Sequence, residues 1–254
     1  MIRSLKSLTG VRIQAIDGGI GKTEDFFFNS DKWTVRYVVV TTGGWLVRNK
    51  VLISPISITK VTDQTFEVNL TKVRIEKSPD IDTDKPVSRQ REIDYYNYYN
   101  WPYYWRGAGA WGVAPAPGGL DVFSEPKKRS KEKDELSEQE KGDPNLRSFA
   151  STRDYRVAAS DDIFGHVEDL LMDDINWNIK YAVVDTVSWW PSKTVLLPSK
   201  LIKSISWDEV TFITNLLHKE VQDAPEFHPQ IEISPEYLAS VEAYYEKFKN
   251  RLAA

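Results

Sequence analysis

Short apolar runs separated by polar breaks fill most of the chain, and this is the pattern of β-strands. In the first third, runs rich in Val, Ile, Phe and Tyr are bounded by Gly, Asp, Asn and Pro. Gly43-Gly44 is predicted to form a bend, because Gly takes positive φ without a steric penalty. We expect strands at about residues 11–16, 23–29, 35–41, 45–48, 51–53, 58–61 and 65–70. Short strands at this spacing predict a small β-barrel, since closure removes exposed strand edges.

The same pattern occurs twice. Residues 3–61 align with residues 147–205 without a gap, and eighteen of the aligned pairs are identical. The identical pairs include Gly21/Gly165, Glu24/Glu168, Asp25/Asp169, Trp33/Trp177 and Tyr37/Tyr181. After a two-residue insertion near Trp207, the match continues to Tyr99/Tyr245. A repeat of about a hundred residues predicts two tandem domains rather than a solenoid of short repeats.

A helical tail is predicted after each barrel. Ser234 fits a helix N-cap and Pro235 the first helical position, and apolar residues then recur at helical spacing over residues 235–252. The first copy repeats this plan from Ser88 onward. We therefore expect a mainly β protein with a first domain at 1–105, a linker at 106–145 and a second domain at 146–254. The joining region is aromatic over residues 95–111, then rich in Gly and Pro, and charged over residues 125–145.

Composition limits the kinds of function that the chain can be expected to have. The chain has 254 residues, a net charge of -4 and no Cys. The acidic balance lowers the expectation of general nucleic-acid binding, and the lack of Cys excludes disulfides and thiolate metal sites. No apolar run is long enough for a transmembrane helix, and the N-terminus lacks the apolar core of a signal peptide. We expect a cytoplasmic protein.

Motifs for catalysis or cofactor binding are weak. The run from Gly18 to Thr23 resembles the end of a phosphate-binding loop, but Ile16 stands where that motif needs Gly, and a strand pattern follows instead of a helix. We interpret it as a β-turn. Acidic pairs such as Asp161-Asp162, Glu168-Asp169 and Asp173-Asp174 lack calcium-loop spacing. Turn chemistry accounts for Asp173-Asp174.

Isolated charges also fit structural roles. Glu24 and Glu168 fit strand-face charges paired with a neighbouring Lys or Arg. The three His residues, His166, His218 and His228, show no partner at ligand spacing in the sequence. We expect no catalytic, cofactor-binding or metal-binding residues, and no cofactor.

The surplus of aromatic residues is the strongest functional signal. One alternative is that these side chains pack onto a barrel of their own chain. The other is a surface for a protein partner or for a homodimer, because Tyr, Trp and Arg are enriched at binding hot spots. The candidate residues are Tyr98, Tyr99, Trp101, Tyr103, Tyr104, Trp105, Arg106, Trp111 and Trp190.

Three matching stretches carry a family resemblance: Gly165 to Leu171, Tyr181 to Asp185, and Val195 to Pro198. With their counterparts in the first copy, they resemble the PRC-barrel family, named for the cytoplasmic domain of the photosynthetic reaction centre H subunit. The resemblance covers both units and implies small β-barrels that bind or position other proteins. The chain resembles the bacterial members of this family that contain two copies of the domain.

We therefore expect a non-enzymatic protein-binding or scaffold module. The alternatives are a factor associated with ribosome or RNA maturation, or a reaction-centre-related assembly protein. The acidic balance argues against direct contact with nucleic acid.

Overall fold

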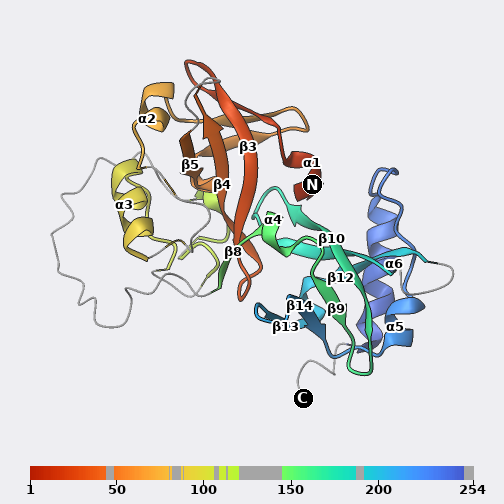
Figure 1. Cartoon of the computed structure of the whole chain (residues 1–254). Coiled ribbons are helices and arrows are strands. Elements are labelled where there is room, and N and C mark those ends of the chain that lie inside the picture. Colours follow the sequence, from red (N-terminus) through yellow and green to blue (C-terminus); the bar gives the residue numbers. More distant parts are fainter. Residues whose placement is uncertain are drawn as a thin grey trace. The chain divides into compact units, whose positions relative to one another are not determined.

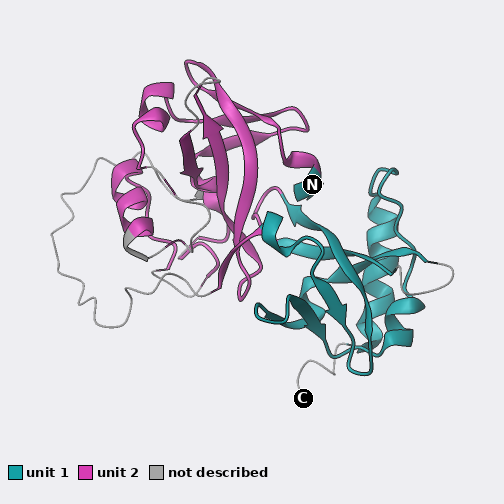
Figure 2. Ribbon diagram, in the orientation of Figure 1, with its two compact units in different colours: residues 1–6, 149–173, 179–254 teal, residues 7–148, 174–178 magenta. Residues whose placement is uncertain are grey.

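The computed structural model describes residues 1–43, 49–79, 81, 87, 89–105, 109–112, 114–119, 145–186 and 192–248. These residues form two compact units, coloured separately in Figure 2. Unit 2 contains most of the first half of the chain, residues 7–148 and 174–178. Unit 1 contains residues 1–6, 149–173 and 179–254. Most of the predicted linker, including its charged stretch, lies outside the described residues.

Unit 2 is built on a mixed seven-stranded sheet (Figure 1). Its strands follow the order β5-β4-β3-β2-β7-β6, with β8 paired to β3, and only the β2–β7 pair is parallel. The strands are β2 (Arg12–Ala15), β3 (Gly18–Asn29), β4 (Thr34–Thr42), β5 (Asn49–Ile53), β6 (Ile58–Val61), β7 (Thr65–Val68) and β8 (Leu146–Ser148). The helices are α2 (Lys72–Glu76) and α3 (Arg89–Tyr99), with 3-10 turns at Pro55–Ser57 and Pro117–Gly119.

Unit 1 repeats this sheet. Its strands follow the order β12-β11-β10-β9-β14-β13, with β1 paired to β10 and a parallel β9–β14 pair. The strands are β1 (Ile2–Ser4), β9 (Arg156–Ala158), β10 (Ile163–Asp173), β11 (Ile179–Asp185), β12 (Thr194–Pro198), β13 (Ile202–Ser206) and β14 (Thr211–Thr214). The helices are α5 (His218–Gln222) and α6 (Pro235–Tyr245), with a 3-10 turn at Ser199–Leu201. Two short helices, α1 (Leu5–Leu8) and α4 (Phe149–Thr152), follow β1 and β8.

The mainly β class and its duplication are thus confirmed. The long hairpins form where β-branched and aromatic residues dominate, and their inward side chains make the core of each unit. Phe26, Val38 and Leu52 in unit 2 are fully buried, as are Val167, Val184 and Leu196 in unit 1. Among the described residues no ladder joins β5 to β6 or β12 to β13, so the structure shows two mixed seven-stranded sheets in which closure into barrels is not detected.

The first strands of the two repeats are exchanged. β1 is the first strand of the first repeat in sequence, yet it pairs with β10 of unit 1. β8 is the first strand of the second repeat and pairs with β3 of unit 2. Each unit therefore holds the first strand of the other repeat, which the predicted domain ranges did not foresee.

A buried aspartate holds each exchanged strand. The Ser148 hydroxyl donates to Asp25 at 2.5 Å, and the Ser4 hydroxyl donates to Asp169. The backbone N–H of Lys6 also donates to Asp169, at 2.9 Å. Burial raises the pKa of the Asp169 carboxyl, and these hydrogen bonds oppose that shift. The identical Asp25/Asp169 and Ser4/Ser148 pairs of the repeat are therefore structural.

The tail helix α6 begins where the sequence predicts, whereas Ser88, the predicted start of the first tail, lies outside the described residues. Ser234 Oγ accepts a hydrogen bond from the N–H of Tyr237 at 3.1 Å, which confirms the N-cap of α6. The α-helix ends at Tyr245, earlier than the predicted residue 252, and the last four residues of that range lie outside the described part. Among the described residues, no helix combines the length and apolarity needed to cross a bilayer.

Candidate binding surface on unit 2

The aromatic segment packs largely into unit 2. Tyr99, Trp101, Tyr104 and Trp111 are at most 4% exposed. The rings of Tyr99 and Trp101 stack with centroids 4.3 Å apart, and the Trp101 indole donates to Ser57 Oγ at 2.8 Å. These contacts match the first alternative from the sequence, in which the aromatic residues pack onto their own unit.

The remaining candidates in this segment are half-buried. Tyr103 stacks on Trp105 with ring centroids 4.6 Å apart. The Tyr98 hydroxyl donates to the carbonyl of Arg74 at 2.7 Å. Arg106 and Trp190 lie outside the described residues. The exposed part of the segment is therefore smaller than its aromatic content suggested.

Two buried charges explain why the segment folds back. The Arg36 guanidinium lies 4.0 Å from the Tyr104 ring centre and 5.1 Å from that of Trp111, and it donates to the carbonyl of Ala110. The fully buried Glu92 accepts 2.7 Å hydrogen bonds from the hydroxyls of Tyr37 and Tyr104. Burial, and next the negative charge of Glu92, raise the pKa of Tyr37 well above its usual value. The phenol therefore stays protonated and acts as a donor.

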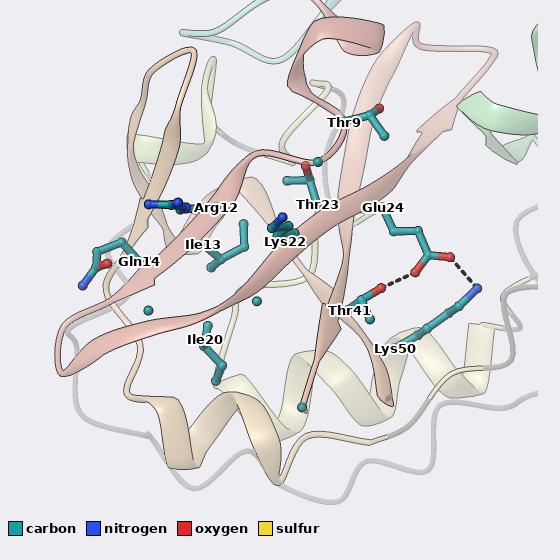
Figure 3. A pocket seen from close by; sticks show the side chains of 14 residues that line it. Thr9, Arg12, Ile13, Gln14, Ile20, Lys22, Thr23, Glu24, Thr41 and Lys50 are labelled. Carbon is teal, nitrogen blue, oxygen red and sulfur yellow. Dashed lines mark hydrogen bonds and ion pairs between the residues drawn. The ribbon is translucent and has the colours of Figure 1, made fainter. Parts of the chain in front are cut away.

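An open pocket of about 840 Å³ lies on the outer face of unit 2 (Figure 3). Its polar lining comes from four neighbouring strands, and the β2–β3 hairpin forms one side. The lining residues with polar side chains include Arg12, Gln14, Lys22, Glu24, Thr41 and Lys50.

Strand register places these side chains together. Arg12 pairs with Lys22, Lys22 with Thr41, and Thr41 with Lys50 across four strands, and paired residues share one face of a sheet. The register shifts between Thr23 and Asp25, so Glu24 lies at a β-bulge next to this row. We call Arg12, Lys22, Glu24, Thr41 and Lys50 the basic row.

Gly21 allows strand β3 to lie close to the backbone of Thr41 on strand β4, beside the basic row. A Cβ at this position would lie 2.2 Å from the carbonyl oxygen of Thr41, so only Gly fits. The equivalent Gly165 faces the carbonyl of Asp185 at the same 2.2 Å. The interpretation of Gly18 to Thr23 as a β-turn is wrong, because the turn lies at Ile16 and Asp17 and strand β3 begins at Gly18 and continues to Asn29. No helix follows, so the glycines serve strand packing and not a phosphate-binding loop.

Only one of the three cations in the basic row forms an ion pair within the described part of the chain. Lys50 Nζ lies 2.7 Å from Glu24 Oε1, and the Thr41 hydroxyl donates to Oε2 of the same carboxylate. This confirms the predicted strand-face pairing of Glu24. Arg12 and Lys22 are exposed and make no ion pair within the described part of the chain. The row thus offers three cations against one carboxylate, which suits anionic groups of a ligand.

The corresponding face of unit 1 brings His166 close to two carboxylates. Ligand atoms of His166, Glu168 and Asp185 all lie within 4.8 Å of one another. This group is not apparent from the sequence, because Asp185 lies on the neighbouring strand, where it pairs with His166. A His-x-Glu spacing on one predicted strand was the only signal.

The other two His residues have ordinary surroundings. The ring of His218 stacks on Phe164 with centroids 6.5 Å apart. His228 Nδ1 lies 3.9 Å from Glu226 Oε1, with both side chains exposed. Asp161 accepts from the N–H of His218 at 2.7 Å, and Asp17 accepts equivalently from Lys72 at 2.8 Å. These aspartates hold the first turns of α5 and α2, which accounts for their identity between the copies.

No protein-family model matches the chain, and no curated protein matches it significantly.

Proposed function

We propose that the chain is a non-enzymatic protein-binding module of two PRC-type β-barrels, with its partner bound at the basic row of unit 2. Closure of each sheet into a barrel is part of this proposal. The core side chains support it, because the fully buried residues Phe26, Val38 and Ile53 are paired in register and share one face of the sheet. A small barrel filled in this way leaves its outside for binding.

The observation that carries the proposal is the open pocket with the basic row. Arg12, Lys22 and Lys50 line it, although the whole chain has a net charge of -4. A local positive surface on an acidic protein favours a partner segment rich in Asp or Glu, because complementary charges steer and align the two surfaces. The half-exposed carboxylate of Glu24 partly offsets the cations and sets the position of Lys50.

A protein partner is favoured over single-stranded nucleic acid by the aromatic residues. A base-stacking platform needs exposed rings beside the cations. Here Tyr99, Trp101, Tyr104 and Trp111 are buried, and the described lining of the pocket includes no aromatic side chain.

Site-specific photocrosslinking tests the proposal. A photoreactive residue at Gln14 in the pocket is compared with one at Ala158, the equivalent position of the other repeat. We expect crosslinks from position 14 to one protein, and their loss when Lys22→Glu and Lys50→Glu are added. The complex should also weaken as salt rises, because exposed charges are screened.

Two results would contradict this function. One is the same set of crosslinked products from positions 14 and 158. The other is a product that disappears on nuclease treatment, which would assign the basic row to nucleic acid.

A further inference from the structure

The two repeats carry the same surface row with different chemistry. In unit 1, Arg156 pairs with His166, His166 with Asp185, and Asp185 with Thr194. Glu168 lies at the β-bulge next to this row, as Glu24 does in unit 2. Three of the five positions differ, because His166, Asp185 and Thr194 replace Lys22, Thr41 and Lys50.

These replacements remove two lysines and add two possible metal ligands, His166 and Asp185. In unit 2 the bulge carboxylate of Glu24 is neutralised by the Lys50 ammonium at 2.7 Å. In unit 1 the lysine position holds Thr194, and Asp185 adds a second carboxylate next to Glu168. Within the described ranges, the side chains of His166, Glu168 and Asp185 make no hydrogen bond or ion pair.

Arg156 is the remaining cation of this row. Its Nη2 donates to the carbonyl of Glu209 at 2.9 Å, so its guanidinium is engaged with the β13–β14 turn. Two carboxylates and one imidazole therefore face each other where the other repeat holds a lysine ammonium.

We propose that His166, Glu168 and Asp185 bind one divalent transition-metal ion of the zinc class. One imidazole nitrogen and two carboxylate oxygens form a ligand set that Zn²⁺ accepts, with a fourth position for water. The imidazole favours this class over Mg²⁺ and Ca²⁺, which take oxygen ligands. The proposal is independent of partner binding at unit 2.

The three ligand atoms lie almost as close together as they would around a bound zinc ion. Zinc bonds of about 2.0–2.2 Å place neighbouring ligand atoms roughly 3.4 Å apart in a tetrahedron. The three ligand atoms lie within 4.8 Å of one another, so small side-chain rotations bring them onto one ion. The side chains stand on paired strands β10 and β11, which hold their backbones in fixed register. All three are half-buried, so an ion can reach them from solvent.

Zinc titration of the full chain, produced without a histidine tag, tests the proposal. We expect one Zn²⁺ per chain by calorimetry and a tetrahedral Co²⁺ absorption spectrum. Three variants introduce the residue found at the equivalent position of unit 2: His166→Lys, Asp185→Thr and Thr194→Lys. Each variant should weaken Zn²⁺ binding at least about tenfold. Thr194→Lys removes no ligand, so its effect would come from the added ammonium.

Control variants distinguish this group from other histidines. His228→Gln and Lys50→Thr should leave the affinity for zinc unchanged, and Ca²⁺ should not compete at equal concentration. Circular dichroism checks that each variant is folded. The proposal is overturned if the folded wild-type chain binds no stoichiometric Zn²⁺, or if Thr194→Lys and Asp185→Thr bind it as tightly as wild type.

Discussion

The hydroxyl of Tyr37 on β4 donates a 2.7 Å hydrogen bond to Glu92 on the tail helix α3, inside unit 2. In unit 1 the equivalent Tyr181 donates to Glu242 of α6 at 2.8 Å. The two glutamates are not at equivalent positions, since Glu92 aligns with Leu238 and Glu242 aligns with Tyr96. They lie one helical turn apart, so both repeats keep a tyrosine–glutamate contact between sheet and tail by different residues.

Breaking this contact should cost more in unit 2 than in unit 1. Tyr37→Phe should lower the free energy of unfolding by about 1–3 kcal/mol, because Glu92 is fully buried. Glu92→Ala should cost more, since it leaves both Tyr37 and Tyr104 without this acceptor. Tyr181→Phe should cost less than about 1 kcal/mol, because Glu242 is 42% exposed and also pairs with Lys200. If urea unfolding showed that Tyr37→Phe and Tyr181→Phe lower the free energy of unfolding equally, the greater contribution of the buried Tyr37–Glu92 contact would be contradicted.

Alkaline pH should unfold the protein cooperatively. Burial is the largest cause that raises the pKa of the phenols Tyr37, Tyr96, Tyr99, Tyr181 and Tyr245. It also raises the pKa of Tyr237 to about 12. A raised folded pKa means that the unfolded chain loses these protons first, so stability is complete below about pH 10 and falls as the pH rises further. The measurement is phenolate absorbance recorded with circular dichroism. A full phenolate signal at intact secondary structure would be the contrary result.

Gly21 should tolerate no side chain. Gly21→Ala puts a methyl group 2.2 Å from the carbonyl oxygen of Thr41, which we expect to cost about 2–4 kcal/mol in unfolding free energy. Gly19→Ala is the matched control on the same strand, where the nearest atom lies 3.7 Å away. Its effect should stay within about 1 kcal/mol. Thermal and urea unfolding measure the stability of the two variants. Similar decreases in unfolding free energy would show that Gly21 does not lie close to the Thr41 carbonyl.

Much of the fold could be predicted because the relevant signals are local. Strand periodicity located the long hairpins, and Ser234 with Pro235 marked the start of α6. The strand exchange could not be predicted, because a hydrophobic pattern identifies strands and not their partners. Arg3-Ser4 and Arg147-Ser148 are identical in sequence, so either strand satisfies either buried aspartate.

The candidate sites were harder to predict than the fold. The basic row joins residues from four strands, and the His166 group joins two, so both depend on register that a single sequence does not give. The composition of the aromatic segment predicted a binding surface as one alternative, yet the buried charges of Arg36 and Glu92 hold much of the segment inside unit 2.

Engineered disulfides can test the strand exchange, because the chain has no Cys of its own. Ile2 is the register partner of Asp173 in the exchanged arrangement. Without exchange, Ile2 would take the place of its equivalent Leu146 and pair with Asn29. Ile2→Cys with Asp173→Cys should therefore oxidise to a disulfide, since paired strand residues have suitable Cα separations. Mass spectrometry should find no disulfide in the folded Ile2→Cys, Asn29→Cys chain; the reverse outcome would disprove the exchange.

The central claim is that the repeats share one outer-face framework and that a few residues in the row set its chemistry. The most direct measurement is the zinc stoichiometry of a chain in which Lys22→His, Thr41→Asp and Lys50→Thr give unit 2 the row of unit 1. The account predicts two Zn²⁺ per folded chain, one at each repeat, against one for wild type. A folded variant that still binds a single Zn²⁺, or none, would contradict it.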